Sequence, residues 1–372
     1  MQPVETQTTA GVDSSKGRLH NFAGGPAALP LPVLEEVRKE LPVYQNAGAS
    51  VLEISHRSPE YTAIQDSARN ILRKLLGIGE EWHIVFLQGG ASMQFYQVPL
   101  NFLPKDGSAD YLLTGAWAKK AFKEGKYVGD ARTAASSEDK NFSYIPKREN
   151  WKLNPDAAYL HFTSNNTIFG TELRTDPQVD VPLVCDASSD FLSRPVDTRP
   201  YGLIYAGAQK NLGPAGVTLV LIRDEFLQKR NPNLPTMLDY GTHTAALFNT
   251  PPVFAVYVVE KVLRWLEGMG GLSAMQQINE KKAKKLYDRI DKNDFYRGTA
   301  EPDSRSLMNV CFRLQNEDLD KQFIAEAKTN GLVGLKGHRS VGGIRASIYN
   351  ACPSESVEAL VSFMDDFERR NG

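Results

Sequence analysis

The stretch from Leu203 to Ile222 constrains the fold of this chain most strongly. Two apolar runs, 203–206 and 217–222, have the character of buried strands and enclose a turn rich in Gly and Pro. Lys210 stands in the middle of that turn. Burial between strands disfavours the ammonium form and lowers a lysine's pKa, so Lys210 is a candidate amine nucleophile toward a carbonyl. The other interpretation is a surface lysine on an ordinary hairpin turn.

A further apolar run, 181–185, ends at Asp186. In an open α/β sheet the carboxyl ends of the strands face the crevice where ligands bind, so we expect Asp186 and Lys210 to lie close together. A lysine that reacts with an aldehyde and a carboxylate that keeps a pyridine nitrogen protonated both suit pyridoxal phosphate, PLP. The pair predicts a PLP-dependent enzyme in which both residues are catalytic.

Length and composition indicate an ordinary globular enzyme. The 372 residues exceed the size at which one core usually divides, so two domains are expected. A net charge of −1 gives no reason to expect nucleic acid or a membrane as a partner. Three widely spaced cysteines without C-x-x-C suggest neither disulfides nor a metal site, which favours a reducing, cytoplasmic location. Residues 1–17 are polar and lack the features of a targeting peptide, which predicts a disordered extension.

Strand and helix patterns alternate along the chain, which is typical of an α/β fold. Strands are expected over 83–87, 110–114, 157–162 and 306–314, and helices over 61–76, 253–266, 272–290, 318–329 and 357–370. A short strand pattern at 50–59 is broken by His56 and Arg57. For Arg57, a buried acidic partner is the competing interpretation.

Glycines follow the strand at 83–87 and precede a helical stretch. This arrangement leaves backbone amides near Ala91 free to converge on an anion, and Ser92 adds a hydroxyl. A glycine pair is more often a plain turn, but the helix that follows favours a phosphate site.

Other polar or aromatic residues stand after strands. Trp117 could stack on a flat cofactor ring or belong to the core. Thr167 could reach a ring oxygen, whereas Asn165 and Asn166 suit a turn. The adjacent Asn249 and Thr250 offer an amide and a hydroxyl just before two prolines.

The segment 334–350 carries four potential cations and no acid: Lys336, His338, Arg339 and Arg345. Surface charges usually alternate with carboxylates, so an acid-free cluster suggests an anionic ligand. For Lys336 a solvated surface charge is the simpler interpretation. Arg345 points opposite to its apolar neighbours, and its planar guanidinium suits a substrate carboxylate or phosphate.

The chain closely resembles the phosphoserine aminotransferases in seven motifs: N-F-A-G-G-P-A, S-V-L-E-I-S-H-R, F-L-Q-G-G-A-S-M-Q-F, T-G-A-W, Y-A-G-A-Q-K-N-L-G-P-A-G, F-N-T-P-P and G-H-R-S-V-G-G-I-R-A-S-I-Y-N. The resemblance runs from about His20 to Gly372. It implies a fold-type I, class V PLP enzyme with a mostly parallel seven-stranded sheet flanked by helices and a smaller C-terminal α/β domain. The large domain would span 34–260, and the small domain 18–33 and 261–372. Members are homodimers with active sites at the subunit interface.

The same resemblance implies roles for single residues. Lys210 would bind the cofactor aldehyde, Asp186 its ring nitrogen and Thr167 its 3-oxygen, with Trp117 stacked on the ring. The cofactor phosphate would be held by Ala91, Ser92 and Gln209, and by Asn249 and Thr250 from the other subunit. Arg345 would bind the substrate's α-carboxylate. Four residues would surround the substrate phosphate, or the side-chain carboxylate of glutamate: His56, Arg57, His338 and Arg339.

The implied reaction is reversible transamination between L-glutamate and 3-phosphohydroxypyruvate, giving O-phospho-L-serine and 2-oxoglutarate in serine biosynthesis. Formation of 4-phosphohydroxy-L-threonine is a second candidate activity. A phosphate ester carries a charge near −2, which an acid-free cationic pocket would match. The chain departs from the family in three places: Ser92 where some members have arginine, Asn166 for a usual glutamate and Cys311 for a common proline.

Other classes fit the residues less well. An alanine:glyoxylate-type aminotransferase would share Lys210 and Asp186 but has no use for His338 and Arg339. A cysteine desulfurase would need a reactive cysteine on a mobile loop, whereas Cys352 is better interpreted as structural. A non-catalytic PLP carrier needs no carboxylate clamp, and a dehydrogenase would need G-x-G-x-x-G after its first strand.

Overall fold

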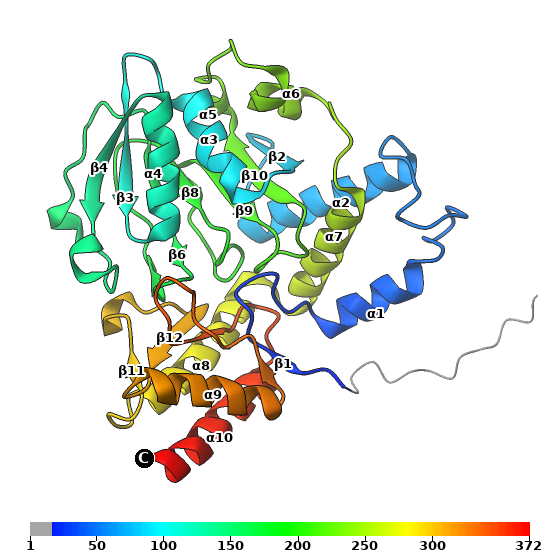
Figure 1. Ribbon diagram of the computed structural model, residues 1–372. Coiled ribbons are helices and arrows are strands. Elements are labelled where there is room, and N and C mark those ends of the chain that lie inside the picture. The colour runs from blue at the N-terminus through cyan, green and yellow to red at the C-terminus, as the bar shows by residue number, and fades with distance from the viewer. Residues whose placement is uncertain (1–16) are drawn as a thin grey trace, which may run out of the picture.

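A seven-stranded sheet forms the centre of the larger part of the computed structural model, which describes residues 17–372 (Figure 1). The strand order is β2–β10–β9–β8–β5–β3–β4, and within this sheet only β10 runs antiparallel to its neighbours. The strands are β2 (Trp82–Leu87), β3 (Ser108–Leu113), β4 (Asp130–Ser136), β5 (Leu160–Thr163), β8 (Leu183–Asp186), β9 (Tyr201–Gly207) and β10 (Thr218–Arg223). The predicted mostly parallel α/β sheet is confirmed. The predicted extension over 1–17 lies, except for its last residue, outside the described residues.

Helices cover both faces of this sheet. Successive strand side chains point to opposite faces, so Ile84 and Phe86 join one core while Val85 and Leu87 join the other. The first core includes side chains of α2 (Pro59–Leu76) and α7 (Val253–Gly268). The second includes side chains of α3 (Gly90–Phe102) and α4 (Ala116–Val128). Burial on both faces explains why the strands read as continuous apolar runs.

The segment before α2 corrects one prediction. The strand expected over 50–59 is a series of turns. The carbonyl of Ser50 accepts hydrogen bonds from the amides of Glu53 and Ile54, and such local bonds compete with strand pairing. The helix α2 then begins after Ser58, whose side chain accepts a hydrogen bond from the Tyr61 amide, and it ends at Gly77 in a left-handed conformation.

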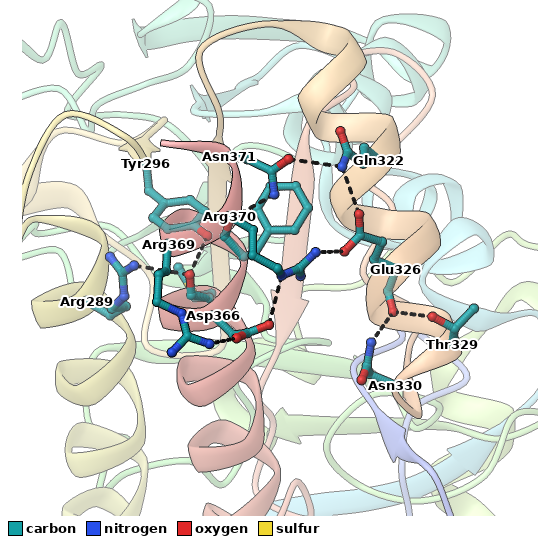
Figure 2. A network of polar contacts seen from close by, with 12 residues as sticks. Arg289, Tyr296, Gln322, Glu326, Thr329, Asn330, Asp366, Arg369, Arg370 and Asn371 are labelled. Atoms are coloured by element: carbon teal, nitrogen blue, oxygen red, sulfur yellow. Dashed lines mark hydrogen bonds and ion pairs between the residues drawn. The ribbon is translucent and has the colours of Figure 1, made fainter.

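A second, smaller unit packs below the sheet (Figure 1). Its three antiparallel strands are β11 (Arg297–Gly298), β12 (Asn309–Arg313) and β14 (Ile344–Ser347). Its helices are α8 (Gly271–Ile290), α9 (Glu317–Thr329) and α10 (Ser354–Asn371). The N-terminal β1 (His20–Asn21) pairs in parallel with β13 (Leu332–Val333), so the start of the described chain belongs to this unit. Figure 2 shows Arg370 of α10 bridging Glu326 of α9 and Asp366 of its own helix, at 2.8 and 3.0 Å.

The remaining elements are short connections, apart from one N-terminal helix. They are α1 (Leu31–Glu40), the two-stranded β6 (Asn165–Asn166) and β7 (Thr171–Glu172), α5 (Asp224–Leu227) and α6 (Tyr240–Ala245). The proposed domain boundary at 260 stays a prediction. Core packing of the large unit continues through α7 to Leu272 and Met275. The small-unit core contains Phe22 and then residues from Ala283 onward.

Candidate active site

Lys210 lies in the turn between β9 and β10, at the carboxyl edge of the sheet. Its side chain is half-buried, and desolvation lowers the pKa of its amine although the charge of Asp186 opposes this shift. The amine lies 5.5 Å from the centre of the Trp117 ring. A lysine with a lowered pKa beside an aromatic face is suited to nucleophilic attack on a carbonyl.

Asp186 is the last residue of β8, the strand next to β9. Its carboxylate accepts hydrogen bonds from the Ser188 amide at 3.0 Å and from the Ser188 hydroxyl at 2.6 Å. That hydroxyl in turn accepts a bond from the amide of Gly207, 3.0 Å away, at the end of β9. Burial raises the pKa of Asp186, and the charge of Lys210 opposes the rise. The carboxylate is therefore held rigidly at the strand ends near the lysine.

A chain of contacts joins the large unit to the small one above this pair. The indole nitrogen of Trp117, at the start of α4, donates to the hydroxyl of Thr167 at 3.1 Å. The guanidinium of Arg345, on β14, donates to the carbonyl of Thr167 at 3.1 Å. Its Nε has no hydrogen-bond partner among the described residues, so it retains capacity for a ligand. These contacts bring together three residues predicted from separate motifs.

Two glycines near the N-terminus pack against Lys210 and Arg345, and the sequence analysis gave them no role in the site. A Cβ at Gly24 would lie 2.3 Å from Arg345 Nη2, and one at Gly25 would lie 3.2 Å from Lys210 Cγ. Gly25 also has φ of +132°, which L side chains rarely adopt. The adjacent glycines in N-F-A-G-G-P-A were the available signal, because paired glycines often mark close approach of backbone to a functional group.

The predicted phosphate turn has the geometry of an anion site. Gly89 and Gly90 both have positive φ, and α3 begins at Gly90, which leaves the amides of the first turn without helical partners. Ala91 is half-buried and Ser92 is exposed. Gln209 lies beside Lys210, and its carbonyl accepts a bond from Ala27 at 2.9 Å.

The segment containing Asn249 and Thr250 lies at the same edge of the sheet. The Asn249 amide donates to Gln88 at 3.0 Å, and the Gln88 amide donates to the carbonyl of Thr250 at 3.0 Å. Gln88 directly precedes the glycine turn. In one chain, then, the two segments expected to hold a cofactor phosphate are neighbours.

Cations gather next to Arg345. His338 and Arg339 lie in the loop before β14, and Arg339 is exposed. The pKa of His338 is lowered by desolvation and then by the charges of Arg345, Arg339 and Lys120, which shows that these groups share one space. The motif analysis did not select Lys120, whose amine lies 4.2 Å from the centre of the Trp117 ring.

His56 and Arg57 are not brought to this pocket. Figure 1 shows the loop between α1 and α2 at the edge of the chain beyond α2 and α7, on the opposite side from α4 and β6. Within residues 17–372, neither side chain has a hydrogen bond or ion pair with another predicted site residue. Arg57 is exposed, and the buried acidic partner considered for it is absent from the same residues.

Asn165 and Asn166 do more than form a turn. The Asn165 amide donates to Asn309 of the small unit at 2.7 Å, and its carbonyl oxygen Oδ1 accepts from Ser306 at 2.6 Å. Asn166 fits against Gly115, where a Cβ would lie 2.3 Å from its Oδ1. Both asparagines are buried, and the two bonds of Asn165 help fix the junction between the units, whereas the amide of Asn166 donates to Thr114 of the large unit at 3.2 Å.

The arrangement fits PLP. It offers an amine for the aldehyde, a carboxylate for the ring nitrogen, an indole for the ring face and a glycine turn for the phosphate. Residues 17–372 contain no cluster of His, Cys, Asp and Glu that could hold a metal ion. None of the helices over these residues has the length and apolarity needed to cross a bilayer.

Comparisons with known proteins bear on the same question. The model of the class-V aminotransferase family matches residues 19–360. The phosphoserine aminotransferase of Desulfosudis oleivorans is 54% identical over 360 residues, which cover 95% of this chain and 99% of that protein. The chain belongs to the phosphoserine aminotransferase family of class-V aminotransferases.

Solved structures agree with this family. Phosphoserine aminotransferase from Bacillus circulans subsp. alkalophilus superposes with a TM-score of 0.93 at 51% identity, covering 95% of this chain and 99% of that one. The PLP-bound enzyme from Trichomonas vaginalis gives 0.90 at 42% identity, covering 94% and 100%. These findings confirm the sequence-based predictions of the family, of a transaminase and of PLP as the cofactor. The roles of single residues stay predictions.

Proposed function

We propose that this member of the family catalyses reversible transamination between L-glutamate and 3-phosphohydroxypyruvate, giving O-phospho-L-serine and 2-oxoglutarate in serine biosynthesis. One observation carries the proposal: the desolvated Lys210 and Asp186 lie close to Arg345, whose neighbours are the imidazole of His338 and the guanidinium of Arg339. Relatives with 54% identity bear the name of the same enzyme. Formation of 4-phosphohydroxy-L-threonine is proposed as a second activity, since it needs the same phosphate pocket.

The residues of the chain divide the work between them. PLP, when bound, supplies an electrophilic carbon and a protonated ring that accepts electrons. Asp186 would keep the ring nitrogen protonated, and the amine of Lys210 would take the proton from the substrate Cα and deliver it to C4′, the former aldehyde carbon of the cofactor. Arg345 holds the α-carboxylate and so sets the orientation of the Cα–H bond. Glutamate and the phosphorylated keto acid use the site in turn, as a ping-pong cycle requires.

The phosphate pocket would draw on both subunits of a homodimer. The loop between α1 and α2, which carries His56 and Arg57, lies on the opposite side of the chain from α4 and β6, so their proposed role requires a second copy (Figure 1). Large apolar side chains are exposed on the segments that such a dimer would cover: Val43, Leu52, Met93, Tyr96 and Phe248. A two-fold axis beside Gln88 would also let Asn249 and Thr250 of each chain reach the partner's glycine turn. A cytoplasmic location is part of the proposal and rests on the buried, unpaired cysteines.

Mixed dimers test the shared sites. Lys210→Ala and Arg57→Leu chains are refolded together and assayed with glutamate and 3-phosphohydroxypyruvate. If Arg57 acts across the interface, half of the dimers gain one intact site, and about a quarter of wild-type activity returns. If Arg57 acts in its own chain, or not at all, mixing restores nothing beyond the activities of the two parents. Sedimentation of the wild type gives the oligomeric state separately.

A substrate panel tests the reaction itself. Purified protein is loaded with PLP and converted to its amino form with glutamate, and keto acids are then added singly. We expect 3-phosphohydroxypyruvate to react at least roughly 100 times faster than hydroxypyruvate at low concentration, because the cations would be left unpaired by the unphosphorylated acid. Equal rates for the two acids, or a preference for glyoxylate, would contradict the proposed substrate.

A further inference from the structure

Lys282 of α8 is a buried cation outside the site described above. Its side chain is 2% exposed, and its amine donates to the carbonyls of Ile348 at 3.0 Å, Tyr349 at 2.7 Å and Cys352 at 3.1 Å. An ammonium has three donors, so all of them are used. Within residues 17–372 no carboxylate forms an ion pair with it, and burial lowers its pKa to about 8. A charge kept in such a place needs a reason beyond packing.

The three carbonyls belong to one loop, 348–352, which follows β14 directly. Arg345, the proposed carboxylate clamp, lies on that strand. Beyond Arg345, the amine of Lys282 therefore holds the main chain of this loop at three points. The carbonyl of Tyr349 also accepts from the Cys352 amide at 2.9 Å. An apolar residue at 282 would therefore leave the carbonyls of Ile348 and Cys352 without this donor, which is costly in a protein interior.

The other side of the loop is bonded to the turn that carries Lys210. The amide of Asn350 donates to Oδ1 of Asn211 at 2.9 Å, and Asn211 is the residue after Lys210. The Asn211 side chain also donates to the carbonyl of Phe191 at 2.8 Å. Asn279, one turn before Lys282 on α8, donates to the side chain of Asn350 at 2.8 Å. All of these groups are buried.

A third contact joins the loop to the glycine pair Gly24 and Gly25. The hydroxyl of Tyr349 donates to the carbonyl of Gly24 at 2.9 Å, and Gly24 lies against the guanidinium of Arg345. The loop 348–352 therefore touches the surroundings of Lys210 on one side and those of Arg345 on the other. Buried networks of this kind fix one geometry when every member is satisfied.

We propose that Lys282 is a positioning residue that sets the distance between Lys210 and Arg345 by holding the loop 348–352. The inference rests on the proposed roles of Lys210 and Arg345. Binding of the substrate α-carboxylate would then depend on a side chain that touches neither the substrate nor the cofactor.

The test compares two buried cations of the same helix. Lys282→Met removes the charge and keeps the volume. Arg289→Met is the control, because Arg289 is also buried on α8 and donates to a main-chain carbonyl, that of Met364 at 3.2 Å, but faces α10 (Figure 2). Both PLP-loaded variants are titrated with glutarate, a dicarboxylate without an amine, by following the absorption band of the bound cofactor. Hydrogen exchange of the amides at 345–352 is measured in parallel.

We expect Lys282→Met to weaken glutarate binding and kcat/KM for glutamate by about 10-fold, mostly through KM, with faster exchange at 345–352. Arg289→Met should lower thermal stability. It should change neither the glutarate dissociation constant nor kcat/KM for glutamate by more than about twofold. Equal losses in the two variants, or unchanged glutarate binding in Lys282→Met, would overturn the inference.

A second variant covers the case in which Lys282→Met does not fold. Asn211→Ala removes the Oδ1 that accepts from the Asn350 main-chain amide, so it breaks the link between the loop and the Lys210 turn directly and should give a similar loss. Wild-type glutarate binding in this variant would contradict the network. If Lys282→Met folds, the double variant should lose little more than either single one, and strict additivity would argue against a shared loop. A wild type that fails to react with glutamate would refute the proposed function instead, so the two failures are distinguishable.

Discussion

Asp186 ends a buried strand and Lys210 lies in the turn after the next one, whereas Arg339 and Arg57 lie on exposed loops. The first pair is surrounded by short hydrogen bonds, such as those from Ser188 to Asp186. Arg57 and Arg339 have no ion pair within residues 17–372. The side of the site proposed to bind the cofactor, the cofactor side, thus has its hydrogen bonds in place before any ligand binds. The side proposed to bind the substrate phosphate, the phosphate side, depends on exposed loops that an anion or a partner can order.

By this division, the residues proposed for proton transfer lie near the core, and the residues proposed for substrate specificity lie on the surface. Changes around Asp186 should affect stability as well as activity, because the same bonds hold the strand ends. Changes to Arg339 should affect substrate choice alone. Four substitutions test this division.

The largest effect is expected at the cofactor side. Lys210→Ala should reduce the half reaction with glutamate by at least roughly 1,000-fold, because the amine that moves the Cα proton is removed. Lys336→Ala, which removes an exposed lysine of the small unit, is the control and should retain full activity. Single-turnover release of 2-oxoglutarate is the measurement. Wild-type turnover in Lys210→Ala would refute the assignment.

Asp190 tests whether the buried side is coupled to stability. It lies behind Asp186 and accepts a bond from Ser164 at 2.5 Å, and burial, followed by the charge of Glu172, raises its pKa to about 7. Between about pH 4 and 7 the folded state holds a proton that the unfolded state has lost, so stability falls as pH rises through this window and the loss is complete above it. Asp190→Asn should remove this fall, worth roughly 2 to 4 kcal/mol.

The measurement for Asp190→Asn is the free energy of unfolding in urea at pH 5 and pH 8. Asp106→Asn, at an exposed acid of the turn before β3, is the control and should keep the wild-type slope. An unchanged slope in Asp190→Asn would show that the carboxyl is already ionised in the folded protein at pH 5.

Arg339→Leu tests the phosphate side. We expect kcat/KM for 3-phosphohydroxypyruvate to fall by roughly 10- to 100-fold, because one charge-assisted pair is lost, with thermal stability unchanged. The rate with hydroxypyruvate should fall far less. Arg297→Leu is the control, a change of the same kind at an exposed arginine of the small unit, and should alter the rate with neither keto acid. Equal losses with both acids would contradict the anion pocket and the division drawn above.

The smallest effect is expected at Ser92, where some family members have arginine. Because Ser92 is exposed at the start of α3, Ser92→Arg should lower KM for the phosphorylated substrate by only about two- to fivefold. Raising the salt concentration should abolish the gain. Ser92→Ala serves as the comparison, and a gain in that variant would exclude a charge effect.

Much of the sheet could be predicted from the sequence because buried strands leave a clear apolar pattern. The runs before Asp186 and on either side of Lys210 became β8, β9 and β10, and the rule for strand ends placed the two residues together. The strand expected at 50–59 was wrong because its pattern is equally compatible with turns when serine side chains and carbonyls satisfy the backbone locally.

No local sequence pattern predicted the contacts between the large and small units. Asn350 bonds Asn211 across 139 residues, and Asn165 bonds Asn309 across 144. Each of these asparagines looks like a turn or surface residue when read along the chain. The place of Lys282 beneath the loop 348–352 was equally invisible, since a lysine on an amphipathic helix normally reaches solvent.

The sequence by itself determined the class of fold, PLP as the cofactor, and the family, because these depend on local periodicity and on short motifs. Tertiary structure alone decided that Gly24 makes room for Arg345, that Lys282 holds the loop behind it, and that the loop carrying Arg57 lies on the opposite side of the chain from α4. The physical reason is that such contacts join segments far apart in the chain, and their energies depend on distances that no local pattern encodes.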